Sequence, residues 1–440
     1  MRVVDSVTAT YAAPPRATTQ RAASAAASLL PLTILIYGAM LPPEVRLMIG
    51  GVAFYAYRIV GFAILPWLLG QFGKGIRLSV GDGLILIGAA WMVVSFVAFY
   101  GVEGFARGVG LAVDVAIPYL CARASIKSYQ DLRRLLIYCL PGLIIAGAAV
   151  AAESLSHRLI VRPIFASIFG DLSSYENGVA VSNARFFVDY RMGLLRASGP
   201  FPHPILGGLF LSSFLPLFLR AGLKGWPKIA GPITGFLGFF SVSSAVFLAY
   251  AVDIGLIIID AILRFARLKI WPVIIGSTAI LLLAAQVASG GRLVGFISRI
   301  SLNPATAYYR QLIWEYGSQS ILDHPIIGIG FSEYQRLSWM TPSVDNYWLL
   351  LGIRHGFLTP VCIFVFCLMF IWKLGQSLKY VPAQDQKLGQ ALNVCVFTLV
   401  ITAFTVSYFS GMQTLFYILL GAGASLWSES VVAGSARQGR

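Results

Sequence analysis

The stretch Asp82-Gly-Leu-Ile-Leu-Ile-Gly-Ala-Ala-Trp-Met-Val-Val-Ser-Phe-Val-Ala-Phe-Tyr100 decides the fold class of the chain. No residue after Asp82 in it is charged, and nearly every side chain is apolar. About 20 mostly apolar residues make a helix long enough to cross the hydrocarbon core of a membrane. The stretch therefore predicts a transmembrane helix over 82–100.

Similar apolar stretches recur along the whole chain. Two of them, 229–243 and 244–263, join through the tight turn Ser-Val-Ser-Ser at 241–244. Together the stretches predict an all-α polytopic membrane protein with about twelve transmembrane helices. The expected spans cover residues 29–48, 50–70, 82–100, 105–122, 135–152, 204–220, 229–243, 244–263, 270–288, 346–372, 390–409 and 411–428.

The composition supports the same fold class. Of 440 residues, 58% are hydrophobic and only 12% are charged, and the mean hydropathy is +0.78. That charged share is about half of what soluble globular domains carry. An ordinary soluble enzyme is thereby excluded, and so is a disordered or collagen-like chain. The five cysteines lie in or beside apolar runs, which predicts buried core residues and neither disulfides nor a zinc site.

The sequence predicts one large domain with two short ends. Residues 1–28 are rich in Ala, Ser, Thr and Arg, which indicates a disordered cytoplasmic tail. A cleavable signal peptide is the alternative, but its small residues would follow the apolar stretch, and here they precede it. Residues 29–430 are expected to form a single transmembrane domain that long polar loops interrupt at 153–203 and 289–345, and residues 431–440 a second cytoplasmic tail.

The net charge of +15 supports a topology with both termini inside the cell. With that topology the whole positive excess falls on the cytoplasmic segments, as the positive-inside rule requires. The two long loops then face outside, where the charges balance and the cations are arginines with no lysine. The chain is thus basic because of its topology, and a nucleic-acid partner is not expected.

Both long loops are dense in arginine, histidine, aromatic residues and glycine. Loop 153–203 ends in Phe-Phe-Val-Asp-Tyr-Arg-Met-Gly-Leu-Leu-Arg-Ala-Ser-Gly-Pro-Phe-Pro-His, and loop 289–345 contains Tyr-Tyr-Arg-Gln-Leu-Ile-Trp-Glu-Tyr. Guanidinium groups bind phosphate bidentately, aromatic faces suit sugars, and a carboxylate can take a proton from a hydroxyl. This set suits group transfer onto a hydroxyl. Outside the cell there are no nucleotide triphosphates, so the phosphate-activated donor is expected to be linked to a lipid.

Three motifs resemble the O-antigen ligase and polymerase superfamily. Arg-Ala-Ser-Gly-Pro-Phe-Pro-His-Pro at 196–204 is similar to the first external loop of that family. Arg-Gln-Leu-Ile-Trp at 310–314 and His-Pro-Ile-Ile-Gly-Ile-Gly at 324–330 are similar to its second loop. Asp-Asn-Tyr at 345–347, followed by an apolar run with Gly356 and Leu358, resembles the start of the next span.

The resemblance implies a fold like that of the C-type membrane glycosyltransferases and a glycan donor linked to undecaprenyl diphosphate. It implies no metal, nucleotide sugar or other cofactor. By motif, Arg196 and Arg310 would neutralise the diphosphate leaving group. Ligases of the family carry a histidine before the asparagine of the third motif, and here Asp345 stands there. This departure favours a polymerase over a lipid A ligase, with Asp345 as the general base.

Each candidate residue also has a purely structural interpretation. Arg196 can reach lipid headgroups from the interface, and Arg310 can pack on Trp314 one helical turn away. Asp345 stands where a helix N-cap is expected, and a histidine before proline commonly caps a turn. The residues expected to bind substrate beside the catalytic three are Arg191, His203, Trp314, His324, Asn346, Tyr347 and Arg354.

Charged residues inside the expected spans are costly unless they are paired or face water. Arg58 and Arg107 could bind the lipid diphosphate from within the bundle. Alternatively, Arg107 and Asp114 lie seven residues apart on one helical face and could form a structural pair.

Three functions remain open at this point. The favoured one is polymerisation of undecaprenyl-diphosphate-linked repeat units into a surface polysaccharide at the outer face of a bacterial inner membrane. A ligase that moves finished glycan to a lipid or protein is the first alternative, and a secondary transporter is the second. Besides the lipid-linked glycan and membrane lipid, the expected partners are chain-length-regulating and export proteins.

Overall fold

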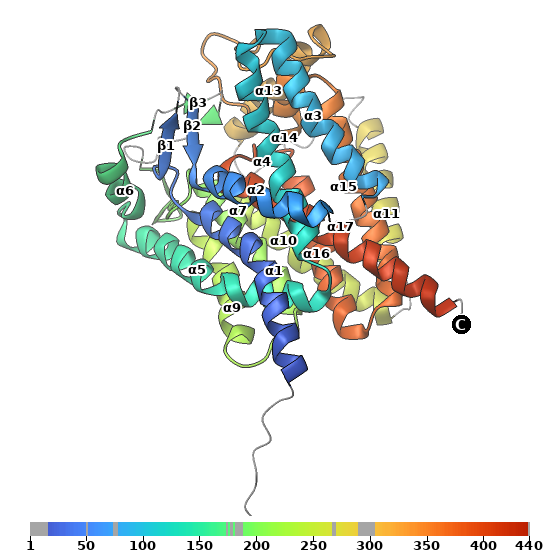
Figure 1. Ribbon diagram of the computed structural model, residues 1–440. Coiled ribbons are helices and arrows are strands. Elements are labelled where there is room, and N and C mark those ends of the chain that lie inside the picture. Colours follow the sequence, from blue (N-terminus) through green and yellow to red (C-terminus); the bar gives the residue numbers. More distant parts are fainter. Residues whose placement is uncertain are drawn as a thin grey trace, which may run out of the picture.

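The computed structural model describes residues 16–49, 52–73, 78–172, 175–176, 179–180, 188–265, 270–288 and 304–438. Most of these residues are helical (Figure 1). The α-helices are α1 (Arg16–Met40), α2 (Ala56–Gly73), α3 (Val80–Tyr100), α4 (Glu103–Ser125), α5 (Tyr129–Ser156), α6 (Val161–Phe169), α7 (Pro204–Ser212), α8 (Phe214–Arg220), α9 (Pro227–Phe236), α10 (Ser244–Phe265), α11 (Ile270–Ala288), α13 (Pro304–Asp323), α14 (Tyr347–His355), α15 (Leu358–Ser377), α16 (Ala383–Thr402) and α17 (Ser410–Gln438). Single 3₁₀ turns follow α9 at Leu237–Ser241 and α15 at Leu378–Tyr380.

Three two-stranded antiparallel hairpins accompany the helices. They are β1 (Arg46–Ile49) with β2 (Val52–Tyr55), β3 (Tyr175–Glu176) with β4 (Val179–Ala180), and β5 (Tyr190–Arg191) with β6 (Leu194–Leu195). The sequence analysis predicted none of them, since it assigned β1 and β2 to apolar spans and β3 to β6 to the long loop 153–203. They lie at the loops between helices and leave the fold class unchanged.

The described residues include helices long and apolar enough to cross a membrane. Five meet both criteria, namely α3, α4, α5, α10 and the segment Leu358–Tyr380. Shorter apolar helices cover Ser28–Met40 and Pro204–Arg220. The chain is therefore a helical, multi-pass membrane protein, as its composition indicates. The five cysteines are buried and free, which agrees with their expected place in the core.

Several expected spans are shorter or interrupted in the structure. The apolar stretches 29–48 and 50–70 do not run as helices to their shared boundary, because Pro42 and Pro43 follow α1 and the chain then forms the β1–β2 hairpin. The expected span 346–372 is broken at Gly356 into α14 and α15.

The N-terminal region also differs from the expectation. Helix α1 begins at Arg16, so the tail expected to be disordered over 1–28 is helical from Arg16 onward. The alanines of this segment favour a helix once the following apolar turns are formed. Residues 1–15 and 289–303 of the expected tail and second loop lie outside the described part of the chain.

Helix α17 is the centre of the bundle. It contacts α1, α4, α15 and α16, and its side chains up to Trp427 are buried on nearly every side. Glycine makes this packing possible, because a Cβ at Gly421 would collide with the carbonyl oxygen of Tyr119 on α4. A helix buried all round cannot tilt freely, so α17 holds the shorter helices around it in fixed positions.

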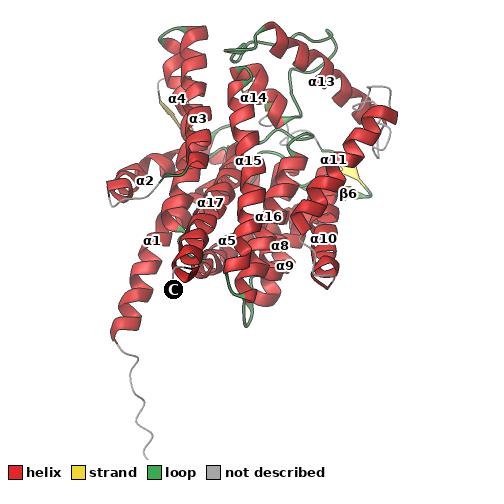
Figure 2. Ribbon diagram, turned by 90° about the vertical axis from the view of Figure 1, so that its right-hand side faces the viewer, coloured by secondary structure: helices red, strands yellow, loops and turns green. Residues whose placement is uncertain are grey.

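The two ends of the bundle carry different structures. Helix α13 and the loop that follows it lie over one end, above α14, and the hairpin strands β1 and β2 lie toward the same end (Figures 1 and 2). The start of α1 and the short helix α9 lie at the opposite end. The motifs singled out in the sequence all fall at or near the end that α13 covers.

Candidate active site

The β5–β6 hairpin fixes Arg196 and its neighbouring acid. Met192 and Gly193 form the turn with φ angles of 54° and 75°, the left-handed pair that a tight hairpin requires. Beyond the strands, the amide of Arg196 donates to the carbonyl oxygen of Asp189 at 2.9 Å. The Arg196 Nη1 also donates to the Asp189 carboxylate at 2.7 Å. One short hairpin therefore determines where the Arg196 guanidinium lies.

A buried acid and a buried arginine hold the segment from Arg196 to His203 in place. Glu153, fully buried at the end of α5, accepts a hydrogen bond from the Gly199 amide at 2.8 Å. Arg162 donates to the carbonyl oxygen of Pro202 at 3.0 Å and pairs with Glu44 at 2.7 Å. The Ala-Ser-Gly-Pro-Phe-Pro part of the motif thus has a structural role, since it anchors the loop that carries Arg196 and His203.

Helix α13 places Arg310 through its close packing on α14. A Cβ at Gly317 would press on Leu349, and a Cβ at Gly352 would press on Ile321. The later residue of α13 thus meets the later residue of α14, so the two helices run parallel where they touch. With this register, Arg310 near the start of α13 lies next to the residues just before α14, where Asp345 lies.

Asn346, not Asp345, caps α14. The Asn346 side chain accepts from the Leu349 amide at 2.9 Å and donates to the Phe404 carbonyl oxygen at 2.8 Å. Asp345 takes no part in the cap, and its carboxylate accepts a hydrogen bond from the Ser343 hydroxyl at 3.2 Å. The structural interpretation of Asp345 as an N-cap is therefore wrong, and its carboxylate is available to the site.

Asp345, Arg196 and Arg310 influence one another electrostatically. The Asp345 carboxylate is open to a cleft but has protein on most sides, and this loss of solvent raises its pKa, while Arg310, Ser343 and Arg196 act to lower it. Burial lowers the pKa of Arg196, and so does the nearby Arg191, while Asp189 and Asp345 raise it. Burial and Arg191 lower the pKa of Arg310 as well, against Asp345.

Each of the two arginines keeps a hydrogen-bond donor unused. In the described part of the chain, Nε of Arg196 and Nε of Arg310 are buried and have no hydrogen-bond partner. A buried donor without a partner costs about 1–3 kcal/mol, and more when it is charged. A bound ligand that accepts a hydrogen bond from such a donor would remove this cost.

His203 lies beside this group at the start of α7. Its Nδ1 accepts a hydrogen bond from the Ile205 amide at 3.2 Å, so it caps the helix as one sequence interpretation proposed. Burial, together with Arg196 and Arg162, lowers the pKa of His203 to about 3, which leaves the ring neutral at physiological pH. His203 and Asp345 both line one cavity, which also reaches Ser343 and Thr405–Ser407. We call it the Asp345 cavity.

The other predicted residues lie around this centre or away from it. Arg191 Nε is 3.7 Å from Asp189, which keeps it beside Arg196. Trp314 stacks on Phe404 with ring centroids 6.2 Å apart and an interplanar angle of 13°, and so helps fix α13. Tyr347 is buried with its hydroxyl 2.8 Å from that of Tyr417, as a packing residue. His324 is exposed at the end of α13, and no contact joins it to the Asp345 cavity among the described residues.

The segment His-Pro-Ile-Ile-Gly-Ile-Gly at 324–330 supports the break between α14 and α15. The Ile329 amide donates to the Ile353 carbonyl oxygen at 2.8 Å, and the Phe357 amide to that of Pro325 at 2.8 Å. Gly328 has a φ of 67° and lies against the backbone of Arg354, where a Cβ would collide. These glycines thus let the segment pack against the break between the two helices.

The sequence analysis missed two parts of the site. The α16–α17 loop, residues 403–409, lines the Asp345 cavity, and its Ala403 and Phe404 carbonyl oxygens accept hydrogen bonds from Tyr347 and Asn346. The sequence analysis assigned these residues to the expected span 390–409, because the loop is part of the same apolar run. The anchoring acids Glu153 and Glu44 were missed too, because a carboxylate at the end of an apolar stretch gives no sign of the amides or arginine that it will meet.

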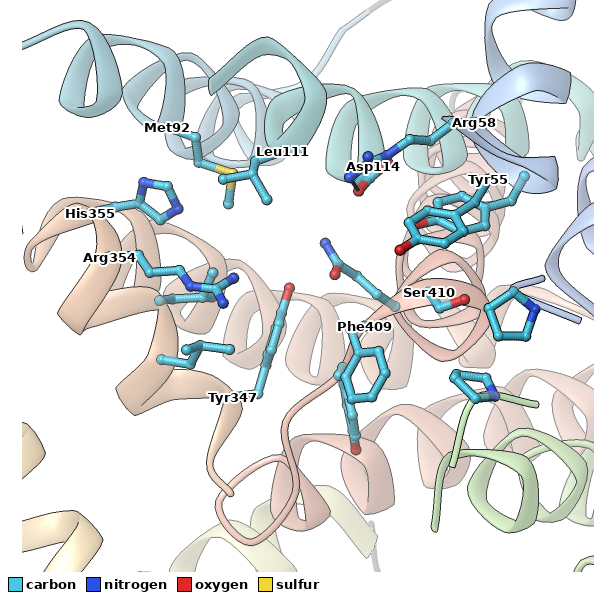
Figure 3. Close-up of a pocket in the computed structure, with 17 residues that line it drawn as sticks. Tyr55, Arg58, Met92, Leu111, Asp114, Tyr347, Arg354, His355, Phe409 and Ser410 are labelled. Atoms are coloured by element: carbon cyan, nitrogen blue, oxygen red, sulfur yellow. Dashed lines mark hydrogen bonds and ion pairs between the residues drawn. The ribbon is translucent and has the colours of Figure 1, made fainter. Parts of the chain in front are cut away.

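A second cavity, which we call the tyrosine cavity, adjoins the first (Figure 3). It is a cavity of about 80 Å³, partly open to solvent, between β2, α2, α3, α4, α14 and α17. Four tyrosines line it, together with Arg58, Asp114, Arg354 and His355. Phe409 lines both cavities, so it lies between them. The four tyrosines are Tyr55, Tyr57, Tyr347 and Tyr408.

The partner of Asp114 differs from the one proposed on sequence spacing. Asp114 accepts two hydrogen bonds from Arg58, at 2.8 and 2.6 Å, and these span α2 and α4. Arg107 is exposed, with its guanidinium 5.5 Å from the centre of the Tyr100 ring. Intrahelical spacing suggested Arg107, but the bidentate geometry that a guanidinium prefers is reached only from the neighbouring helix.

A comparison with models of known protein families finds no match for the chain, and a comparison with curated proteins finds no similar sequence.

Proposed function

We propose that the chain is a membrane glycosyltransferase that polymerises oligosaccharide repeat units linked to undecaprenyl diphosphate. The observation that carries the proposal is the pair of buried guanidinium groups, Arg196 and Arg310, with unused Nε donors beside the Asp345 carboxylate. Two such donors suit a diphosphate, and a neighbouring carboxylate suits proton removal from a sugar hydroxyl. Asp345 in the position of the ligases' histidine favours a polymerase over a ligase.

In this mechanism each residue has one task. Arg196 and Arg310 donate hydrogen bonds to the diphosphate and stabilise the negative charge that grows on it as the bond to the sugar breaks. The attacking hydroxyl of the acceptor glycan forms the new bond to the anomeric carbon, and its proton passes to Asp345. Undecaprenyl diphosphate leaves with the electron pair of the broken carbon–oxygen bond, so the products are a longer glycan and the free carrier.

The proposal includes the finer topology. About twelve spans, with both termini in the cytoplasm, put the Asp345 cavity on the outer face of a bacterial inner membrane. The lipid-linked donor resides in that face, and proteins that set chain length or export the polymer would meet the product there. The arginine-only cations of the two long loops fit a face where diphosphate is bound.

Deletion of the gene, with plasmid-borne variants returned, tests the proposal. Loss of a polymerase leaves single repeat units on gels of surface polysaccharide, whereas loss of a ligase leaves long chains on the carrier lipid. We expect Asp345→Asn to behave as the deletion while the protein is present at the wild-type amount. Glu333→Gln is the matched control, because Glu333 is an exposed acid on the same loop. Normal polymer length and attachment in the deletion strain would reject both glycosyltransferase functions.

A further inference from the structure

The mechanism proposed above assigns no role to the tyrosine cavity, yet the residues that line it suit a bound ligand. Arg354 and His355 lie at one end, Tyr55 and Arg58 at the other, and Tyr347 and Phe409 between them (Figure 3). Its walls come from both halves of the chain. Polar groups that converge on a concave space are typical of a small-molecule site.

One ion pair in the lining is compensated internally, and Arg354 adds one positive charge at the other end of the cavity. Arg58 holds Asp114 through two hydrogen bonds, so the two charges compensate each other. The guanidinium also lies 5.7 Å from the centre of the Tyr55 ring. A diphosphate needs uncompensated donors, such as the Nε groups of Arg196 and Arg310. A compensated Arg–Asp pair still offers N–H donors and carboxylate lone pairs to hydroxyl groups.

The aromatic rings favour a sugar. Tyr55 and Tyr57 are stacked with centroids 5.9 Å apart and an interplanar angle of 6°, so they form an ordered aromatic pair in the cavity wall. Tyrosine combines such a face with a hydroxyl that can donate or accept. Flat faces beside hydroxyl, amide and carboxylate groups match the apolar ring face and the polar edge of a pyranose.

Two features at the start of α17 also point to a ligand. Ser410, which lines the cavity, has a φ of 53°, a conformation that costs about 1–3 kcal/mol in a residue other than glycine and that clusters at ligand sites. Gln413 lines the cavity one turn later and is half-buried. Its amide has no hydrogen-bond partner in the part of the chain that the structure describes.

The two cavities are close enough for one glycan to occupy both. Phe409 lines each of them, and the adjacent residues Pro202 and His203 line one cavity each. We propose that the tyrosine cavity binds the acceptor glycan, with the sugar held there next to the one whose hydroxyl gives its proton to Asp345. The acceptor role rests on the polymerase function proposed above.

Binding measured apart from polymerisation tests this assignment. The full chain in lipid nanodiscs is titrated with repeat-unit oligosaccharides released from the host strain's own surface polysaccharide. We expect Gln413→Leu to weaken binding about tenfold, the effect of one lost hydrogen bond. Gln376→Leu is the matched control, since Gln376 is exposed on α15 outside the tyrosine cavity. Arg310→Ala should bind the oligosaccharide as the wild type does.

A second variant keeps the test decisive if Gln413→Leu does not fold. Leu111 lines the cavity, and Leu111→Trp should fill it and abolish binding while thermal unfolding stays cooperative. Wild-type chain that does not bind the oligosaccharide, or unchanged binding by both variants, would overturn the proposal. So would inorganic diphosphate binding that Leu111→Trp removes, because the cavity would then be an anion site.

The polymerisation assay separates the two proposals. With lipid-linked donor fixed, Gln413→Leu should raise the acceptor concentration for half-maximal rate about tenfold and leave the maximal rate unchanged. An unchanged acceptor requirement would reject the acceptor role. A deletion strain with normal polymer would reject the polymerase itself and leave the oligosaccharide titration unaffected, so the two failures can be told apart.

Discussion

The arginines that join helices of the bundle differ from Arg196 and Arg310, the two arginines near Asp345, in how their donors are used. Arg162 donates to Glu44 and to the Pro202 carbonyl oxygen, and Arg58 makes two bonds to Asp114 and one to Ala53. Arg196 and Arg310 each keep a buried Nε without a partner among the described residues. Arginine thus appears with every nitrogen bonded, as in Arg162, and with a buried nitrogen left over, as in Arg196 and Arg310 and also in Arg133 among the described residues.

The difference has a physical meaning. Removing a guanidinium from water is expensive, and a saturated ion pair recovers much of that cost. An unsaturated one does not recover it, so the fold is less stable than it could be at that place. Groups kept at such a cost, and shifted in pKa by their neighbours, are typical of sites where a ligand completes the hydrogen bonds.

The largest expected effect is on stability and concerns a buried ion pair. Glu44→Leu leaves the buried Arg162 guanidinium without its carboxylate, and we expect a loss of about 3–5 kcal/mol in the free energy of unfolding. Denaturant unfolding in detergent, followed by tryptophan fluorescence, measures it. The double variant Glu44→Leu/Arg162→Leu should recover most of the loss, because no unpaired charge remains. Equal losses in the single and double variants would mean that packing, not charge, dominates here.

The opposite pattern is expected for an unsaturated arginine. Arg310→Ala should lower the polymerisation rate about 10²–10³-fold, the usual cost of removing one donor to a developing negative charge. Its unfolding free energy should change little, since Arg310 Nε has no partner to lose. Arg336→Ala is the control, because Arg336 lies on the same external segment, where it contacts the exposed Glu333 carboxylate, the Met340 carbonyl oxygen and the Tyr334 ring. If Arg310→Ala unfolds as readily as Glu44→Leu, the distinction between the two kinds of arginine fails.

The sequence predicted the helices better than their ends. An apolar run such as 82–100 determines a helix by its length alone, and α3 covers it. Where one run holds a break, as at Gly356 or between α16 and α17, apolarity gives no signal, because both sides of the break are equally apolar. The break depends on contacts with other segments, such as the hydrogen bond that the Phe357 amide donates to the Pro325 carbonyl oxygen.

The site was predictable only in its residue types. Arg196, Arg310 and Asp345 drew attention through motif and charge, and they do affect one another's pKa. Asp345 and Asn346 are equally good cap formers, so sequence could not tell which of them caps α14. Nor could it pair Arg58 with Asp114, since the partners come from different helices and intrahelical spacing pointed to Arg107.

An intermediate effect is expected from the pH dependence of Asp345. Its pKa is raised in the folded protein, so folding favours the protonated form. Stability should therefore fall as pH rises from the ordinary aspartate value of about 3.9 through the raised pKa, and then level off. Asp345→Asn should remove this slope and unfold at a higher temperature than the wild type near neutral pH. Thermal unfolding of both proteins across that range measures it.

Activity should follow the same titration in the opposite sense. Polymerisation needs the ionised carboxylate, so the acid limb of the rate should lie at a higher pH than a solvent-exposed aspartate would give. Asp345 therefore differs from the ion-paired residues of the bundle. The reaction requires its ionised carboxylate, and the ionised carboxylate lowers the stability of the fold. A wild-type stability that rises with pH over this range would show that Arg310 and Arg196 outweigh burial.

The smallest effect separates two adjacent residues. Asn346→Ala removes the acceptor for the Leu349 amide and the donor to the Phe404 carbonyl oxygen, so we expect a loss of about 1–2 kcal/mol in unfolding free energy. Asn346→Asp keeps the cap acceptor and should lose less. Asp345→Ala removes no cap and should abolish polymerisation without that loss of stability. If Asp345→Ala is the more destabilising of the two alanine variants, Asp345 contributes to the helix start after all, and the assignment of capping to Asn346 and proton transfer to Asp345 must be revised.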